Sequence, residues 1–347
     1  MSRLIHTYQN IISVENLLLA WQEFLRGKKG KKDIILFQTK LMDNILSLHQ
    51  DLKNKTYKHG GYVAFNISDP KPRNIHKATV RDRLLHHAIY RILYPYFDTK
   101  FIHGSYSCRI GKGTHRAINR LREFHRKVSK NNTKTCYVLK CDIRKFFANI
   151  DHRILKNILA QHIKDKDVLW LLGQVINSFS SQKHIYAMAD MYKGLPLGNL
   201  TSQLLVNIYM NEFDQYMKRA LKIKCYIRYA DDFVILQNDK IELENLLSKI
   251  SNFLCESLKL SLHPDKVYIK TIASGVDFLG WVNFPKHRVL RTSTKRRALK
   301  NLLNNPTKPV IVSYLSLFKH GNMKKIQAGA GLRYNGQNGR AFVYRRI

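Results

Sequence analysis

Aspartates occur at two points of the chain where a β-strand is expected to end. Asp142 ends an apolar stretch, and Asp231 and Asp232 lie in a tight connection between two β-rich stretches. Carboxylate oxygens are the ligands that hard divalent cations prefer, and two Mg²⁺ ions can activate a 3′-hydroxyl and stabilise a leaving pyrophosphate. The pattern predicts in-line phosphoryl transfer with two Mg²⁺ ions, for which Mn²⁺ can substitute. Taken alone, Ala-Asp-Asp is more often a solvated turn.

The strands that must carry these carboxylates are short. Residues 136–142 are expected to form a strand buried on at least one face, and 224–229 and 233–236 a pair that encloses the Ala-Asp-Asp. Because neighbouring strand residues point to opposite faces, Asp231 and Asp232 cannot bind metal equivalently without local distortion. We therefore expect Asp231 to be the closer partner of Asp142.

The remaining chain alternates helical and β-rich stretches. Short apolar stretches broken by Gly and Pro predict strands and turns over 56–80. Apolar spacing predicts helices at 11–25, 34–53, 80–97, 114–129, 153–177, 201–220, 241–258 and from 294 to about 320. Further strands are expected at 266–272 and 277–284. The fold class is α+β, with a central sheet that carries the acidic residues.

Charge is distributed very unevenly along the 347 residues. The chain holds 60 Lys and Arg against 24 Asp and Glu, a formal net charge of +36. The balance is +2 over 1–51, +16 over 52–141, +3 over 142–277 and +15 over 278–347. Two basic arms thus flank a nearly neutral centre, as expected for a protein that grips a polyanion from two sides. Nucleic acid is the predicted partner, and salt should weaken its binding steeply.

Composition also excludes other classes. No run approaches the roughly 18 apolar residues of a membrane-spanning helix, so no membrane partner is expected. The five cysteines form no Cys-x-x-Cys pair, which favours reduced thiols in the cytoplasm over a disulfide framework or a zinc site.

The sequence resembles a known family at ordered blocks. Tyr229-Ala230-Asp231-Asp232 resembles the catalytic box of reverse transcriptases. The other matching blocks are K-P-R at 71–73, A-T-V-R-D-R-L-L at 78–85, S-Y-S-C-R-I-G-K-G-T-H at 105–115, L-K-C-D-I-R-K-F-F-A-N-I-D at 139–151, G-L-P-L-G-N-L-T-S-Q-L-L-V-N-I-Y at 194–209, L-S-L-H-P-D-K at 260–266 and D-F-L-G-W at 277–281. The resemblance covers about residues 55–285 and implies an RNA-directed DNA polymerase with a right-hand fold.

The block at 194–209 also indicates a subtype. Group II intron enzymes usually carry Q-G-x-x-x-S-P where this chain has Leu197-Gly198-Asn199-Leu200-Thr201-Ser202-Gln203. The Ser-Gln form resembles reverse transcriptases of diversity-generating retroelements, which copy a template-repeat RNA with errors, chiefly at template adenines, for mutagenic retrohoming. No maturase-length thumb, HNH-like cluster or RNase H-sized domain fits after residue 285. Alternatives are a retron or phage-defence (abortive infection) reverse transcriptase, and a non-catalytic RNA-binding relic of the fold.

The resemblance assigns roles to individual residues. The implied catalytic residues are Asp142, Asp231 and Asp232, with Ile143 added as a fourth metal-binding position. Phe147 is implied to pack under the incoming sugar and to select deoxynucleotides, whereas its neighbour Phe146 is expected in the core. The implied dNTP-binding cations are Lys71, Arg73 and Arg109, because guanidinium groups pair bidentately with phosphate oxygens. Phosphate-backbone contact is the alternative role for these cations.

Other residues are implied to contact template and primer. Leu197, Gly198, Ser202 and Gln203 form the predicted template and fidelity segment, in which Gly198 allows close backbone approach. Lys266 is implied to donate a proton to pyrophosphate, although a solvated lysine fits equally well. The predicted primer grip is Phe278, Leu279 and Gly280.

The predicted organisation follows the right-hand polymerase. An N-terminal helical extension (1–54) precedes fingers (55–135), a palm with an antiparallel sheet (136–284) and a basic helical thumb (285–347). A helical insertion is expected at about 156–193. The resemblance further implies four partners: an RNA/cDNA duplex, dNTPs, a structured template RNA and a small basic helical accessory protein. It also implies a cytoplasmic location in a bacterium, with the protein encoded by the bacterium or by a phage.

Overall fold

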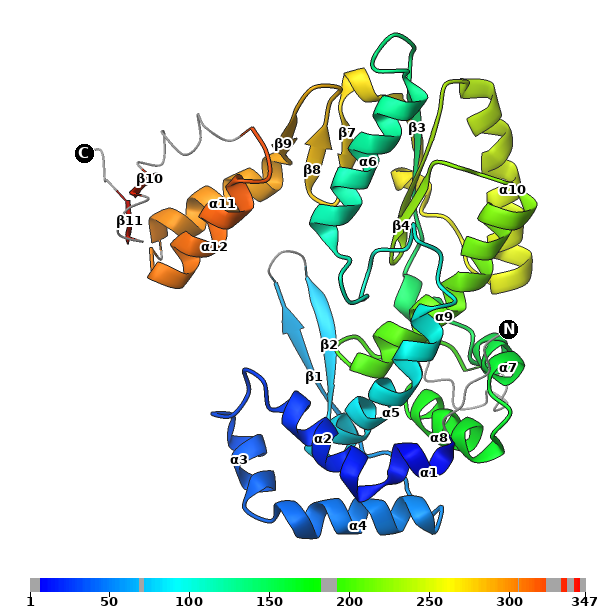
Figure 1. Ribbon diagram of the computed structural model, residues 1–347, viewed down its shortest axis with the longest axis vertical. Helices are drawn as coiled ribbons and strands as arrows, with labels where there is room; N and C mark the ends of the chain where they lie inside the picture. Colours follow the sequence, from blue (N-terminus) through cyan, green and yellow to red (C-terminus); the bar gives the residue numbers. More distant parts are fainter. Residues whose placement is uncertain are drawn as a thin grey trace.

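A four-stranded antiparallel sheet carries the three aspartates at one end. Its strand order in the computed structural model is β4-β5-β3-β6 (Figure 1). The structure describes residues 7–68, 72–181, 192–304, 306–322, 332–335 and 340–343. The strands are β3 (Tyr137–Asp142), β4 (Tyr226–Tyr229), β5 (Asp232–Gln237) and β6 (Tyr268–Thr271). The predicted strands at 136–142, 224–229, 233–236 and 266–272 are therefore confirmed to within a few residues.

The two faces of this sheet are covered by different helices. Leu139, Cys141 and Phe233 belong to the large hydrophobic core that also includes buried side chains of α9 and α10. Val138 and Val234, on the opposite face, pack in a second core together with α6. The covering helices are α6 (Thr114–Val128), α9 (Leu200–Gln215, continued by a π-helical turn at Tyr216–Ala220) and α10 (Lys240–Leu258). Because both faces are buried, the strands are nearly continuous apolar runs.

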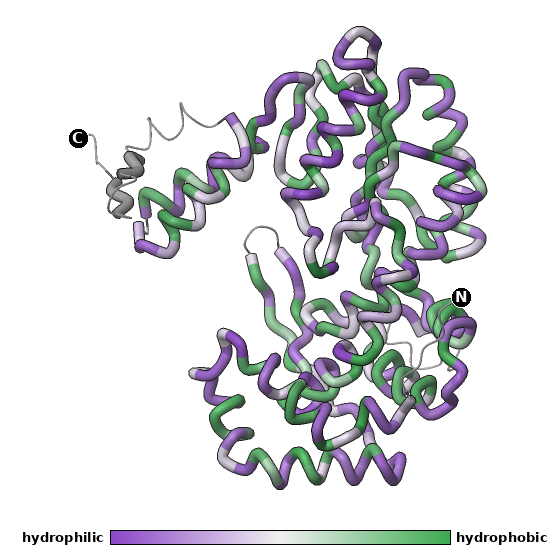
Figure 2. Tube along the Cα trace, in the orientation of Figure 1, coloured by the Kyte–Doolittle hydropathy of each residue, from purple (hydrophilic) through white to green (hydrophobic). Residues whose placement is uncertain are grey.

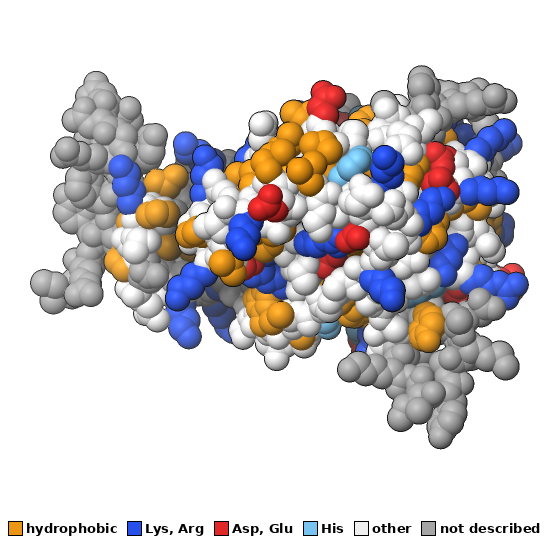
Figure 3. Space-filling model, turned by 90° about the horizontal axis from the view of Figure 1, so that it is seen from below, with side chains coloured by type: hydrophobic (Ala, Val, Ile, Leu, Met, Phe, Trp, Pro, Cys, Tyr) orange, Lys and Arg blue, Asp and Glu red, His pale blue; other side chains and the backbone are white. Residues whose placement is uncertain are grey.

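Helices at the N-terminus pack around α5 (Val80–Asp98) in the lower half of Figure 1. They are α1 (Tyr8–Ile12), α2 (Val14–Phe24), α3 (Lys32–Gln38) and α4 (Leu41–Lys53). Hydrophobic and hydrophilic residues alternate along these outer helices (Figure 2), as amphipathic packing requires. Some large apolar side chains stay exposed, among them Leu36, Met42 and Leu46. Hydrophobic side chains are also visible on the face seen from below (Figure 3).

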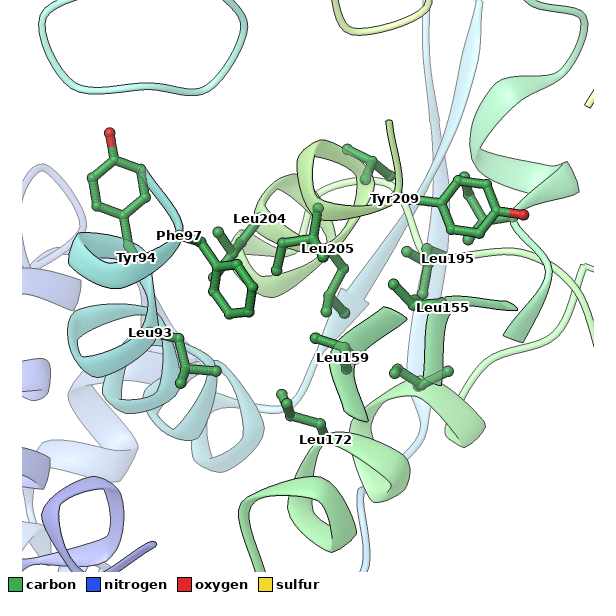
Figure 4. Packing of buried hydrophobic residues seen from close by; sticks show 14 of the residues in the cluster. Leu93, Tyr94, Phe97, Leu155, Leu159, Leu172, Leu195, Leu204, Leu205 and Tyr209 are labelled. Atoms are coloured by element: carbon green, nitrogen blue, oxygen red, sulfur yellow. The ribbon is translucent and has the colours of Figure 1, made fainter. Parts of the chain in front are cut away.

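One continuous core joins these helices to the sheet. Leucines of α5, α9, α7 (His152–His162) and α8 (Lys166–Asn177) face one another and Phe97 of α5 in Figure 4. Side-chain caps begin α7, α8 and α10: the carboxylates of Asp151, Asp165 and Asp239 accept hydrogen bonds from backbone N–H groups in the first turn. Both α7 and α8 lie where the helical insertion was predicted, and residues 182–191 of that insertion lie outside the described residues.

A two-stranded hairpin, β1 (Tyr62–Ile67) and β2 (Arg73–Ala78), projects from the N-terminal helices toward the sheet (Figure 1). The backbone N–H of His76 donates to the Leu197 carbonyl at 3.0 Å, and Asn199 Nδ2 donates to the His76 carbonyl at 3.1 Å. These bonds attach the hairpin to the segment that precedes α9. The hairpin and the predicted template segment are therefore positioned together.

A second, three-stranded antiparallel sheet follows the first one in the chain. It consists of β7 (Val276–Phe278), β8 (Trp281–Asn283) and β9 (Arg288–Leu290). The predicted boundary between palm and thumb at 284/285 thus falls inside a sheet, between β8 and β9. Helices α11 (Thr292–Asn304) and α12 (Lys308–Phe318) come next, as predicted, followed by a hairpin of β10 (Leu332–Asn335) and β11 (Arg340–Val343). Within the described ranges, no helix is long and apolar enough to cross a bilayer.

Candidate active site

The three aspartates meet at the tip of the four-stranded sheet. Asp142 is the cross-strand partner of Asp232, so their side chains leave the same face of the sheet. Asp231 occupies the two-residue turn between β4 and β5, and its carbonyl accepts a hydrogen bond from the Ile143 N–H at 3.1 Å. Ala230, the other turn residue, has φ of +55°. This left-handed conformation costs a non-glycine residue about 1 kcal/mol, a strain typical of functional turns.

Mutual repulsion and burial act on these carboxylates. Burial, and then the negative charge of Asp142, raises the pKa of Asp231 above its ordinary value. Burial raises the pKa of Asp232 to about 7, with further contributions from Asp231 and Asp142. Burial, more than mutual repulsion, therefore disfavours the charged forms of these two carboxylates. A bound cation would lower these pKa values.

Two lysines supply part of the neutralising charge. Lys266 Nζ lies 3.0 Å from Asp142 Oδ1 and hydrogen-bonds to it. Lys140 Nζ lies 3.3 Å from Asp232 Oδ1, an ion pair that lacks hydrogen-bond geometry. Lys266, the predicted proton donor, thus pairs with the predicted catalytic carboxylate of Asp142, although its side chain is 43% exposed. Its role in proton transfer stays a prediction.

The donor set fits a hard divalent cation. Among the described residues, no group of three or more His, Cys, Asp and Glu side chains is arranged to hold a metal ion. The carboxylates nevertheless have the chemistry that such an ion requires, because they are oxygen ligands that repel one another. In addition, Asp232 Oδ1 is buried and accepts no hydrogen bond from any described residue. Asp231 lies in the β4–β5 turn itself, and Asp142 ends the neighbouring strand β3.

A buried arginine supports the turn at Ala230 and Asp231. The side chains of Arg228 and Asp214 are both fully buried, and they form a bidentate pair, with Nε to Oδ1 at 2.8 Å and Nη2 to Oδ2 at 2.6 Å. Arg228 Nη1 also donates to the Ala230 carbonyl at 3.2 Å, and Nη2 to Ser105 Oγ at 3.1 Å. One guanidinium therefore links α9, the loop around Ser105 and the strained turn.

The predicted phosphate-binding cations behave differently from one another. Arg73 begins β2, is exposed, and is close enough for its charge to lower the pKa of Asp231. Lys71 lies outside the described residues. The structure contradicts the prediction that Arg109 binds the dNTP. Its side chain is nearly buried and donates hydrogen bonds to the Asp98 carboxylate and to the carbonyls of Asp98, Ile102 and Ser105. Its guanidinium anchors the loop after α5 and is not free to pair with a triphosphate.

The predicted sugar and template contacts lie in the turn that follows β3 and at the start of α9. Phe147 is half-buried, whereas Phe146 is buried in the core as expected. Gly198 has φ of +104°, and a Cβ there would come within 2.8 Å of Ile75 Cγ2 on β2. The close approach of the β1–β2 hairpin thus explains why residue 198 is a glycine. Leu197 and Gln203 are half-buried, and Ser202 is buried in the first turn of α9.

The predicted primer grip forms the turn between β7 and β8. Leu279 and Gly280 have φ of +52° and +84°, as in a type I′ hairpin turn, where leucine is strained. Phe278 is fully buried beneath this turn and packs against the sheet core. Its side chain therefore anchors the turn and cannot itself contact a primer, which corrects that part of the prediction.

Sequence reasoning missed the Arg228–Asp214 pair and Lys140. The available signals were an arginine inside the apolar stretch Tyr226–Tyr229 and an aspartate inside an apolar helix. Polar residues in buried elements require partners, but the sequence does not say which.

The family model described as "Reverse transcriptase (RNA-dependent DNA polymerase)" matches residues 58–282. Among curated relatives, YkfC of Escherichia coli K12 is 28% identical over 260 residues, covering 66% of either chain. The group II intron-encoded protein LtrA of Lactococcus lactis is 23% identical, covering 84% of this chain and 58% of LtrA. The chain thus spans less than two thirds of the length of these relatives.

Solved structures agree on the fold. Telomerase of Candida albicans in complex with a fragment of telomeric RNA superposes with a TM-score of 0.51 at 11% identity, covering 77% of this chain and 51% of that one. Apo telomerase of Candida tropicalis also gives 0.51, at 13% identity, covering 69% and 49%. At such identity the likeness shows the fold alone. The predicted right-hand polymerase fold is confirmed.

Proposed function

The chain belongs to the reverse transcriptase family, and we propose from this premise that it copies an RNA template into DNA from dNTPs. The proposal rests on one observation: Asp142, Asp231 and Asp232 lie together at one end of the four-stranded sheet. Primer extension on an RNA template tests it.

In the proposed mechanism, Asp142 and Asp231 would hold divalent cations, with Asp232 and the backbone of Ile143 beside them. Two Mg²⁺ ions, when bound, would activate the 3′-hydroxyl and neutralise the leaving pyrophosphate. Lys266 keeps an ammonium next to Asp142, from which it can donate a proton to pyrophosphate. Arg73, whose charge acts on Asp231, would pair with the triphosphate.

The proposed assignment of elements to fingers, palm and thumb follows the right-hand polymerase fold. The β1–β2 hairpin and α6 belong to the fingers, the four-stranded sheet to the palm, and α11 and α12 to a basic thumb. The charge balances of +16 and +15 in the fingers and thumb segments support a clamp for the RNA/cDNA duplex.

Within the family, we propose a diversity-generating retroelement enzyme that copies a template-repeat RNA with errors at adenines. The support is the segment Leu197–Gln203, which lacks the Gln and Pro that group II intron enzymes usually carry. A small basic helical protein is the proposed accessory partner.

Phe147→Val is expected to relax sugar selection. Removing the ring would free space for a 2′-hydroxyl and raise the efficiency of ribonucleotide relative to deoxynucleotide incorporation by about 10- to 100-fold. Single-nucleotide incorporation kinetics with dGTP and GTP measure this ratio. Phe253→Val, which shortens a half-buried ring on α10, is the matched control and should leave the ratio unchanged. An unchanged ratio in Phe147→Val would refute the role.

Leu197→Gln is expected to change errors opposite template adenine. An apolar side chain beside the nascent pair excludes water but cannot read base edges by hydrogen bonds, whereas glutamine can. Sequencing of cDNA copied from a defined RNA should show fewer misincorporations at adenine, by several-fold, with little change at the other three bases. If the spectrum at adenine is identical to wild type, Leu197 plays no part in fidelity.

A further inference from the structure

A cavity lies away from the catalytic turn, between α6, the β8–β9 turn and the segment that follows α12. Its volume is about 270 Å³. Arg122 contributes from α6, Lys286 and Arg288 from the β8–β9 turn and β9, and His320 from the segment after α12. Figure 1 shows α6 beside β7 and β8. Three separate parts of the chain thus converge on one hollow.

The lining is basic and contains no carboxylate. Besides Arg122, Lys286 and Arg288, it includes Lys319, and none of the lining residues is acidic. Burial and the nearby charge of Arg122 lower the pKa of the Arg288 guanidinium, so these two arginines repel each other. Residues 278–347 contain no Asp or Glu at all. An anion in the cavity would relieve this repulsion.

The cavity also contains an aromatic platform. The rings of Phe284 and His287 stack with centroids 4.8 Å apart and planes inclined by 15°. A backbone hydrogen bond from Phe284 N–H to the His287 carbonyl, 2.9 Å long, closes the turn that holds them. The Phe284 ring packs so closely on Gly275 that a Cβ there would lie 2.8 Å from it. The platform is therefore fixed in place before any ligand binds.

This cavity is separate from the candidate active site. Thr114 Oγ1 donates to the Tyr229 hydroxyl at 3.3 Å, which places the first turn of α6 beside the catalytic hairpin. Arg122 lies eight residues further along α6, or about 12 Å at 1.5 Å per residue. The β8–β9 turn is likewise at the opposite end of β8 from the predicted primer grip at Leu279.

Phosphate-directed cations next to a stacking platform are the features by which proteins bind single-stranded nucleic acid. We propose that this cavity binds a nucleotide of a single-stranded RNA segment, with its phosphate on Arg122 and Lys286 and its base on Phe284 and His287. The Arg288 guanidinium donates to the His320 carbonyl and to Asn119, and it adds positive charge beside them. The inference rests on the proposed function, because the RNA that would bind here is the template of that reaction. The site would hold the template transcript at a point outside the duplex being copied.

The test is equilibrium binding of the full chain to a fluorescent single-stranded RNA oligonucleotide at several salt concentrations. The pocket variant Arg122→Gln/Lys286→Gln is compared with Arg126→Gln/Lys249→Gln, which removes the same charge from exposed positions on α6 and α10. The pocket variant should bind about tenfold more weakly than this control. Its salt dependence, the slope of log K against log salt, should fall by about 1.4.

A third variant, Phe284→Leu, separates stacking from charge. It should weaken RNA binding roughly tenfold while leaving the salt slope unchanged, because no phosphate contact is lost. Equal affinities in the pocket and control variants, or a Phe284→Leu variant that binds like wild type, would overturn the proposal. Tight binding of adenosine monophosphate that the RNA does not displace would also overturn it, since the cavity would then hold a free nucleotide.

Primer extension on a short preformed template–primer separates this inference from the proposed function. A template–primer that leaves only one unpaired template base beyond the primer, too little to reach the cavity, should be extended equally by wild type and the pocket variant. If no variant extends it, the proposed function fails while the RNA-binding comparison remains decisive for the cavity. If wild type extends it but the pocket variant does not, the cavity contacts the duplex and the inference is wrong.

Discussion

Asp231→Asn is expected to lower kcat for dNTP incorporation by about 10³-fold or more, with a much smaller change in KM for the primer–template. The neutral amide is isosteric with the carboxylate but removes the charge that the turn presents to divalent cations. Asp142→Asn should have an effect of similar size, because the two carboxylates act on the same reacting groups. The double variant should be little worse than either single one, as in other sites whose residues act as a unit.

Asp265→Asn is the matched control for this series. Asp265 lies next to Lys266, in the same part of the molecule, but its side chain is 86% exposed and lies 3.9 Å from His263. Its replacement removes one charge near the site without touching the sheet tip, so incorporation should stay within about twofold of wild type. Single-turnover kinetics at saturating dNTP compare the variants. A control variant as slow as Asp231→Asn would mean that net charge, not the turn carboxylate, sets the rate.

Arg228→Met is expected to destabilise the protein by about 3–5 kcal/mol, because it leaves the Asp214 carboxylate buried without its partner. Both side chains are fully buried, so water cannot replace the lost hydrogen bonds. The Ala230 carbonyl also loses its bond from Nη1, and the strained turn loses a support. Urea unfolding measures the change in free energy.

Two further variants identify the origin of this loss. Arg120→Met breaks an exposed pair with Glu123 on α6 and should cost less than about 1 kcal/mol. The double variant Arg228→Met/Asp214→Leu removes both buried charges and should recover part of the loss. If Arg228→Met costs no more than Arg120→Met, the buried pair does not stabilise the turn.

The sequence was sufficient to predict the hairpin that carries Asp231 and Asp232. Asp142 and Asp231 follow apolar runs of strand length, and strand ends in one sheet bring such residues together. Local pattern therefore predicted the secondary structure but not the register, because Asp231 was expected to be the closer partner of Asp142, whereas the residue opposite Asp142 in the sheet is Asp232. The predicted helices and the basic arms follow from equally local signals.

Side-chain direction was harder to predict. Arg109 lies in a segment that matches a phosphate-binding motif, yet it pairs with Asp98 at the end of α5. Phe278 lies in the predicted primer grip, yet its ring fills the core. A motif gives the chain position of a residue, whereas burial and hydrogen-bond partners depend on elements far away in the sequence. Arg228 shows the same limit, because its partner Ser105 is 123 residues distant.

The central claim is that this chain synthesises DNA on an RNA template, and one measurement tests it directly. The chain is given a DNA primer annealed to a defined RNA, Mg²⁺ and one dNTP at a time, in parallel with the primer alone. We expect extension only with the RNA present, rapidly by the dNTP complementary to each template base, and with mismatches concentrated at adenine. Equal extension of the unannealed primer, or incorporation that ignores the template base, would contradict the account.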